Sequence, residues 1–168
     1  MSDYYARHSK ANTDGTKIFA TEADNSAQDE VAARIEDAFG PNLEVKKFGR
    51  LDPIDFYAER DGRMCAFLEV KCRSHASTKY PTVFLNVRKW LALTMASVGF
   101  GVPSFFVVRF TDRVMFVNVA EVDASNQRVG GTKRLVKSHT DREPVIEVPL
   151  NDMKELRHGR EREWRLKG

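Results

Sequence analysis

Apolar side chains recur at helical spacing in two stretches of the chain. In the first, Ser26 and Asp29 form an N-terminal capping pattern. Gly40-Pro41 ends the pattern, as glycine and proline commonly do after a helix. Between them, four apolar residues lie four positions apart on one stripe: Ala27, Val31, Ile35 and Phe39. We therefore predict a helix over residues 26–39.

The second helical stretch covers residues 82–98. Gly99 and Gly101 follow it and are expected to end the helix. Its apolar positions recur three or four residues apart, at Phe84, Val87, Leu91, Met95 and Val98. The pattern predicts that this stripe packs against the core.

Strands are predicted between and after the two helices. The sequence Arg-Asp-Gly-Arg at residues 60–63 is a hairpin signal, so the strands on either side of it should pair antiparallel. The predicted strands are 43–48, 54–59, 64–71, 104–110 and 114–119, with an edge strand at 145–148 and a short helix at 151–156. The order α-β-β-β-α-β-β predicts the α/β class, a mixed β-sheet flanked by helices.

Length and composition limit the class of protein. The 168 residues allow one domain, which we place at residues 26–168 after a flexible polar arm over residues 1–25. No apolar run is long enough to cross a membrane, and the polar start is not a secretory signal. Two cysteines are too few for a disulfide scaffold. We expect an intracellular, cytoplasmic protein.

Charge is distributed unevenly along the chain. The net charge is only +3, but residues 43–168 alone carry a net charge of +7. The basic side chains therefore belong to the middle and the end of the chain, where a polyanion could bind.

Three residues of the first predicted hairpin can form a chemical site. Glu69 and Lys71 are two positions apart on one strand and so share a face. Asp55 lies on the neighbouring strand, where antiparallel pairing can bring it beside Glu69. Two carboxylates at this spacing suit Mg²⁺ or Mn²⁺, and a nearby ammonium can orient or deprotonate an attacking water.

Two alternatives stay open at this stage. Glu69 and Lys71 could form a structural salt bridge where the strand leaves the core, an explanation that gives Asp55 no role. Asp52 could replace Asp55 as the first carboxylate, although an aspartate directly before a proline is typical of a turn.

The pattern Ile54-Asp55, thirteen residues, then Glu69-Val70-Lys71 resembles the PD-(D/E)XK nuclease superfamily, whose core is restriction-endonuclease-like. The resemblance covers residues 26–120. Residues 53–58 look particularly like the metal-binding strand of archaeal Holliday-junction resolvases and of small phage nucleases. The proline does not directly precede the aspartate here, because Ile54 intervenes.

The resemblance implies further site residues. Glu30 on the first helix matches a glutamate that faces the metal in such enzymes, and the backbone carbonyl of Val70 matches a further metal ligand. The second helix contributes a polar or basic residue beside the site, for which Lys89 is our choice. A solvated helix face is the alternative for the neighbouring Arg88.

Basic side chains outside the predicted metal site could bind the DNA backbone. Arg73 and Lys79 follow the catalytic strand in a loop, for which an equal alternative is simple solvation. A basic β-arm at residues 127–142 contains Lys133, Arg134 and Lys137 around a Gly-Gly turn. The C-terminal residues 157–167 are also basic, but interleaved glutamates make a solvated tail an equal alternative.

The sequence therefore predicts a Mg²⁺- or Mn²⁺-dependent nuclease that hydrolyses DNA phosphodiester bonds. The resemblance to resolvases makes branched DNA a candidate substrate, and a homodimer would suit two symmetric cuts. The alternative is a non-catalytic nucleic-acid-binding or assembly protein that kept the fold. The clustered carboxylates disfavour it, because a pure binder gains nothing from negative charge near phosphate.

Overall fold

Six strands form the central sheet in the computed structural model, which describes residues 22–49, 52–130 and 143–157. Their order across the sheet is β1-β2-β3-β5-β6-β9. β3 and β5 are parallel, and the other neighbours are antiparallel. The bounds are β1 (Leu43–Lys47), β2 (Phe56–Arg60), β3 (Arg63–Cys72), β5 (Ser104–Arg109), β6 (Val114–Asn118) and β9 (Lys154–Glu155). The α/β class and the mixed sheet predicted from the sequence are confirmed.

A tight turn fixes the register of β2 and β3. Asp61 and Gly62 both have positive φ, of 51° and 73°, which is the backbone of a two-residue type I′ hairpin. Phe56 pairs with Leu68 and Tyr57 pairs with Phe67. Asp55 directly precedes β2, so the same register sets it opposite Glu69.

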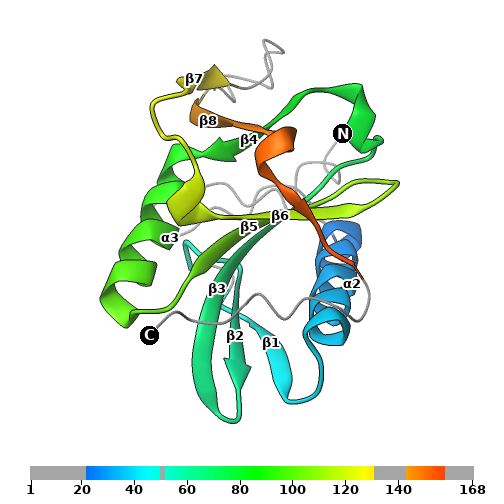
Figure 1. Ribbon diagram of the computed structural model, residues 1–168, viewed down its shortest axis with the longest axis vertical. Coiled ribbons are helices and arrows are strands. Elements are labelled where there is room, and N and C mark those ends of the chain that lie inside the picture. Colours follow the sequence, from blue (N-terminus) through cyan, green and yellow to red (C-terminus); the bar gives the residue numbers. More distant parts are fainter. Residues whose placement is uncertain (1–21, 50–51, 131–142, 158–168) are drawn as a thin grey trace, which may run out of the picture.

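Helix α2 (Glu22–Phe39) covers one face of the central sheet (Figure 1). Val31 and Ile35 are buried in a cluster with Leu68 and Val70 of β3. The helix begins at Glu22, four residues before the start predicted from Ser26. Residues 1–21 of the predicted arm lie outside the described residues.

Helix α3 (Val87–Phe100) lies on the other face, on the left in Figure 1. Leu93 is fully buried in a second cluster with Phe67, Phe106 and Val108. The prediction of one helix over residues 82–98 is wrong at its start. Residues 82–86 form β4 (Thr82–Asn86), which alternates Val83 and Leu85 inward.

The predicted apolar stripe of the second helix is also wrong. Leu91, Met95 and Val98 are 47%, 73% and 81% exposed, whereas Leu93 is buried. Asn86 caps α3, because its side-chain oxygen accepts a hydrogen bond from the backbone N–H of Arg88 at 2.7 Å. The face of α3 that packs on the sheet is therefore the one that carries Leu93.

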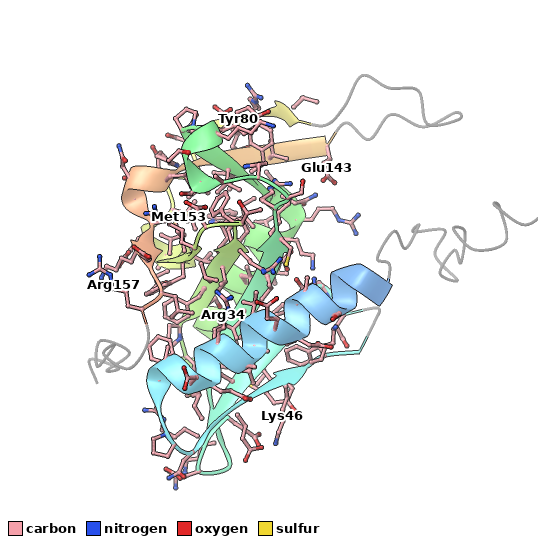
Figure 2. The ribbon with its side chains drawn as sticks, turned by 90° about the vertical axis from the view of Figure 1, so that its right-hand side faces the viewer. Arg34, Lys46, Tyr80, Glu143, Met153 and Arg157 are labelled. Atoms are coloured by element: carbon pink, nitrogen blue, oxygen red, sulfur yellow. The ribbon has the colours of Figure 1, made fainter. Side chains whose placement is uncertain are left out.

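A second, three-stranded sheet has the order β4-β8-β7. In it, β8 (Glu143–Pro149) lies between β4 and β7 (Gln127–Gly130), and both pairings are antiparallel. Residues 145–148 are therefore in the central strand of a separate sheet, not at the edge of the main one. Figure 2 shows Tyr80 and Glu143 at the end of the molecule where this sheet lies.

Three short 3₁₀ helices connect these elements within the described residues. They are η1 (Ser77–Lys79), η2 (Val119–Glu121) and η3 (Leu150–Asp152). The predicted helix at 151–156 is wrong, since η3 and the strand β9 occupy this region. No helix among the described residues is long and apolar enough to span a membrane.

Candidate metal-dependent nuclease site

Asp55 and Glu69 come together at the place where β2 and β3 pair. Glu69 lies in the middle of β3, is 9% exposed and pairs with Phe106 of the parallel strand β5. The Asp55 side chain accepts a hydrogen bond from the backbone N–H of Val70 at 3.1 Å. The hairpin register thus brings Asp55, which directly precedes β2, beside Glu69.

Lys89 connects the two carboxylates. Its Nζ lies 2.8 Å from Oδ1 of Asp55 and 2.8 Å from Oε2 of Glu69. Lys89 is in the first turn of α3, and the side chain is 29% exposed. The sequence placed Lys89 beside the site, but not in contact with both acids.

Lys71 lies on the same face of β3 as Glu69 and is half-buried. Its Nζ donates a hydrogen bond to the backbone carbonyl of Phe84 in β4, at 3.3 Å. Among the ion pairs of the described residues, Glu69 pairs with Lys89 and not with Lys71. The Glu69–Lys71 salt bridge considered from the sequence is therefore not formed.

Burial and charge shift the proton affinities of these groups. Burial, and after it the nearby charge of Asp55, raise the pKa of Glu69 to about 8 against the opposing effect of Lys89. Burial lowers the pKa of Lys71. Burial alone would also lower the pKa of Lys89, but Glu69 and Asp55 outweigh it and the pKa is raised. Titrating groups with such opposed shifts are typical of functional sites.

The peptide group of Val70 is fixed from two sides. Its N–H binds Asp55, and its carbonyl accepts a hydrogen bond from Nε2 of Gln28 at 3.4 Å. Gln28 on α2 was not predicted from the sequence. The signal was available, because Gln28 lies three and seven residues before the buried Val31 and Ile35, on the face of the helix turned to the sheet.

Glu30 is engaged elsewhere in this structure. Its carboxylate pairs with Arg34 at 2.9 Å and with Arg109 of β5 at 2.9 Å, and the side chain is 42% exposed. Glu30 lies two positions after Gln28, so the two side chains point about 200° apart around the helix. A metal-binding role for Glu30 stays a prediction.

The predicted DNA-binding residues lie in different parts of the molecule. Arg73 follows β3, and its backbone N–H donates to the carbonyl of Arg109 at 2.8 Å. Lys79 is exposed in η1, with its Nζ 5.3 Å from the ring centre of Tyr80. Lys133, Arg134 and Lys137 lie outside the described residues.

Asp52 lies apart from these contacts, in the turn before β2. It is exposed, and its backbone N–H donates to the carbonyl of Gly49 at 2.9 Å. This position is the one expected for a turn residue before a proline.

The donor set at Asp55 and Glu69 fits a hard divalent cation. Oε2 of Glu69 is buried, and its close contact is the ammonium of Lys89 at 2.8 Å. No three His, Cys, Asp or Glu side chains cluster as metal ligands in the described ranges. Two carboxylates and a carbonyl are nevertheless enough for Mg²⁺, which keeps several waters and uses only one or two protein carboxylates.

The family model that matches this chain places it among the PD-(D/E)XK endonucleases. More specifically, the chain belongs to the family described as "Phage putative PDDEXK endonuclease", whose model matches residues 16–156. The match includes every residue of the site described above.

Solved structures with a similar fold include a resolvase. The chain resembles the Holliday junction resolvase Hjc of Archaeoglobus fulgidus, with 13% sequence identity and a TM-score of 0.47. That match covers 73% of this chain and 87% of the resolvase. No curated protein matches the sequence.

Proposed function

We propose that this protein is a divalent-metal-dependent nuclease that hydrolyses phosphodiester bonds in DNA. One observation carries the proposal. Two carboxylates, the part-buried Asp55 directly before β2 and the buried Glu69 of β3, each have an oxygen 2.8 Å from one ammonium, with Lys71 on the same face of β3 as Glu69. Membership of a PD-(D/E)XK endonuclease family supports the same assignment.

Asp55, Glu69 and the carbonyl of Val70 would hold Mg²⁺ or Mn²⁺. A bound ion of this kind makes a water more acidic and neutralises charge on the phosphate in the transition state. Asp55 also fixes the Val70 peptide through its N–H, and Gln28 binds the carbonyl. Glu30 is proposed as a further ligand from α2.

Lys71 is proposed to orient and deprotonate the attacking water. A lysine can act as a base only when part of the population is neutral, and burial lowers the pKa of Lys71 in that direction. Its hydrogen bond to the Phe84 carbonyl holds the amine in a fixed place. A fixed amine loses less entropy when the water and the phosphate approach.

The proposed substrate is DNA, bound through its phosphates by Arg73, Lys79, Lys89 and the basic segment that contains Lys133, Arg134 and Lys137. Branched DNA, such as a four-way junction, is the finer proposal. A homodimer would then allow two symmetric cuts.

Cleavage assays with matched variants test the assignment. Plasmid, linear duplex and four-way-junction DNA are incubated with Mg²⁺ or Mn²⁺ and the wild-type protein, Asp55→Ala, Lys71→Ala or Asp52→Ala. We expect the first two substitutions to reduce the cleavage rate by about 100-fold or more. Asp52→Ala is the control, because this exposed aspartate lies only three residues from Asp55 and should retain activity.

Metal-dependent cutting that survives both Asp55→Ala and Lys71→Ala would contradict the assigned site. DNA binding without cleavage of any substrate would instead favour a non-catalytic protein that kept the nuclease fold.

A further inference from the structure

Lys89 holds the position between Asp55 and Glu69 that a divalent cation would need. Its single ammonium contacts one oxygen of each carboxylate at 2.8 Å. Mg²⁺ binds carboxylate oxygens at about 2.0–2.1 Å. An ammonium and a metal ion cannot both lie between the same two oxygens, because they would be in contact and carry like charge.

We propose that Lys89 is a displaceable counter-ion that fills the metal position in the metal-free protein and leaves it when a divalent cation binds. The inference rests on the proposed function, because it concerns the same two carboxylates. In addition, the Lys89 ammonium would compete with the metal ion for the two carboxylates, so Lys89 would set the affinity of the site for metal.

The surroundings of the two lysines distinguish their roles. Lys71 donates to the Phe84 carbonyl and forms no ion pair with either acid, so a cation can enter without moving it. Lys89 contacts both carboxylates through its charged end, and its side chain is 29% exposed. A long, part-exposed side chain on the first turn of α3 has a path to solvent.

The ammonium also explains how the site can fold without metal. Burying two carboxylates side by side is costly, since each loses hydration and repels the other. Lys89 offsets part of this cost with one positive charge. Removing that charge should therefore weaken the metal-free protein and at the same time strengthen metal binding.

Calorimetric titration with Ca²⁺ and with Mn²⁺ tests the competition without requiring cleavage. We compare the wild-type protein, Lys89→Met and the control Arg88→Met. The control removes the same charge from the adjacent residue of α3, whose side chain makes no ion pair with Asp55 or Glu69. We expect Lys89→Met to bind either ion at least about 10-fold more tightly than the wild type. Arg88→Met should bind like the wild type.

Thermal unfolding of the same proteins gives a second measurement. Without metal, Lys89→Met should unfold at a lower temperature than the wild type and than Arg88→Met. Saturating Ca²⁺ should raise the unfolding temperature of Lys89→Met by more than it raises that of the wild type, because ligand stabilisation grows with affinity.

An NMR measurement on the wild-type protein keeps the test decisive if Lys89→Met fails to fold. The side-chain carbon and nitrogen signals of Lys89 should shift when Ca²⁺ saturates the site, while those of Lys154, which is remote in sequence on β9, should not. Unchanged Lys89 signals at saturation would overturn the inference.

The outcomes separate this inference from the proposed function. If the wild type and Lys89→Met bind metal equally, or the variant binds more weakly, the competition is disproved while the metal site stands. If neither binds Ca²⁺ or Mn²⁺, the competition and the metal-dependent nuclease assignment are both wrong.

Discussion

Glu69 is the residue on which the chemistry of the site depends most. It is nearly fully buried, lies beside a second carboxylate and has a pKa raised to about 8 from the ordinary 4.5. A metal ligand must be ionised to bind. In the proposed metal site, a divalent cation would therefore have to offset the cost of ionising Glu69 in its buried position.

A pH-dependent loss of stability follows from this burial. Because the folded pKa of Glu69 is raised, the folded protein takes up this proton more readily than the unfolded chain. The stabilisation is fully present below the ordinary pKa of 4.5 and is lost as the pH rises through about 8. Each unit of the pKa difference corresponds to about 1.4 kcal/mol.

Glu69→Gln keeps the shape of the side chain and removes the titration. We expect the unfolding temperature of Glu69→Gln, relative to that of the wild type, to increase steadily between pH 5 and pH 8 in the presence of EDTA. The measurement is thermal unfolding by circular dichroism at a series of pH values. Glu59→Gln on the neighbouring strand is the control, and a pH-independent difference for Glu69→Gln would contradict the raised pKa.

Gln28 and Glu30 are the two residues of α2 whose effects on metal binding can be compared. The Gln28 amide donates to the Val70 carbonyl, so a glutamate at this position would set two oxygen acceptors against each other. A divalent cation between them would turn this repulsion into coordination. We expect Gln28→Glu to lower the stability of the metal-free protein and to tighten Mn²⁺ binding, both measured on the same preparation.

Glu30→Gln tests the prediction from the sequence in the same experiment. It removes the ion pairs with Arg34 and Arg109, which are exposed and contribute little. If Glu30 is a metal ligand, Glu30→Gln will weaken Mn²⁺ binding. If only Gln28→Glu changes the affinity, the face of α2 that carries Gln28 is the one that meets the metal.

At the scale of elements, the sequence predicts those features that depend on residues close together along the chain. The β2–β3 hairpin was predicted because Asp61-Gly62 and the adjoining strands are neighbours in sequence, and with it came the approach of Asp55 to Glu69. The contact of Lys89 with both acids depends instead on how α3 packs across the sheet. No spacing in the sequence encodes that contact.

The boundary between β4 and α3 shows the same limit. Phe84 and Val87 continue the helical spacing of α3 by chance, whereas Val83 and Leu85 follow the two-residue period of a strand. Residues 82–86 form a strand and not a helix because β4 pairs along its whole length with β8, about sixty residues further along the chain. A local sequence pattern contains no information about a pairing strand that far away in the sequence.

Two substitutions test which face of α3 packs against the core. Leu93→Ala removes a fully buried side chain and should lower the free energy of unfolding by about 2–5 kcal/mol. Met95→Ala removes a side chain of similar size that is 73% exposed, so the loss should be below about 1 kcal/mol. Urea unfolding measures both, and a larger loss for Met95→Ala than for Leu93→Ala would mean that the stripe predicted from the sequence is the buried one.

At the scale of the whole molecule, the two sheets contribute different parts of the proposed site. The six-stranded sheet carries Asp55, Glu69 and Lys71, whereas the smaller sheet receives the Lys71 amine at the Phe84 carbonyl of β4. Its strands β7 and β8 lie on either side of residues 131–142, the part of the basic segment that lies outside the described residues. The strand pair β4–β8 therefore connects the proposed catalytic Lys71 with the strand that follows the proposed DNA-binding segment.

The proposed role of this segment predicts how DNA binding depends on salt. Each phosphate contact by Lys or Arg contributes about 0.9 to the slope of log K against log salt for duplex DNA. The triple variant Lys133→Gln, Arg134→Gln and Lys137→Gln should therefore bind duplex DNA more weakly, with a slope reduced by about 2 to 3. The measurement is fluorescence anisotropy with labelled duplex in Ca²⁺ at several salt concentrations.

A matched triple variant in the C-terminal residues makes this test specific. Arg160→Gln, Arg162→Gln and Arg165→Gln remove the same total charge from a region where glutamates alternate with the basic residues. If the segment at 127–142 contacts phosphates directly, only the first variant changes the slope, because a uniform change in net charge affects both equally. Equal slopes for the two variants would show that the DNA senses only the overall charge of the protein, and the basic arm would have no specific role.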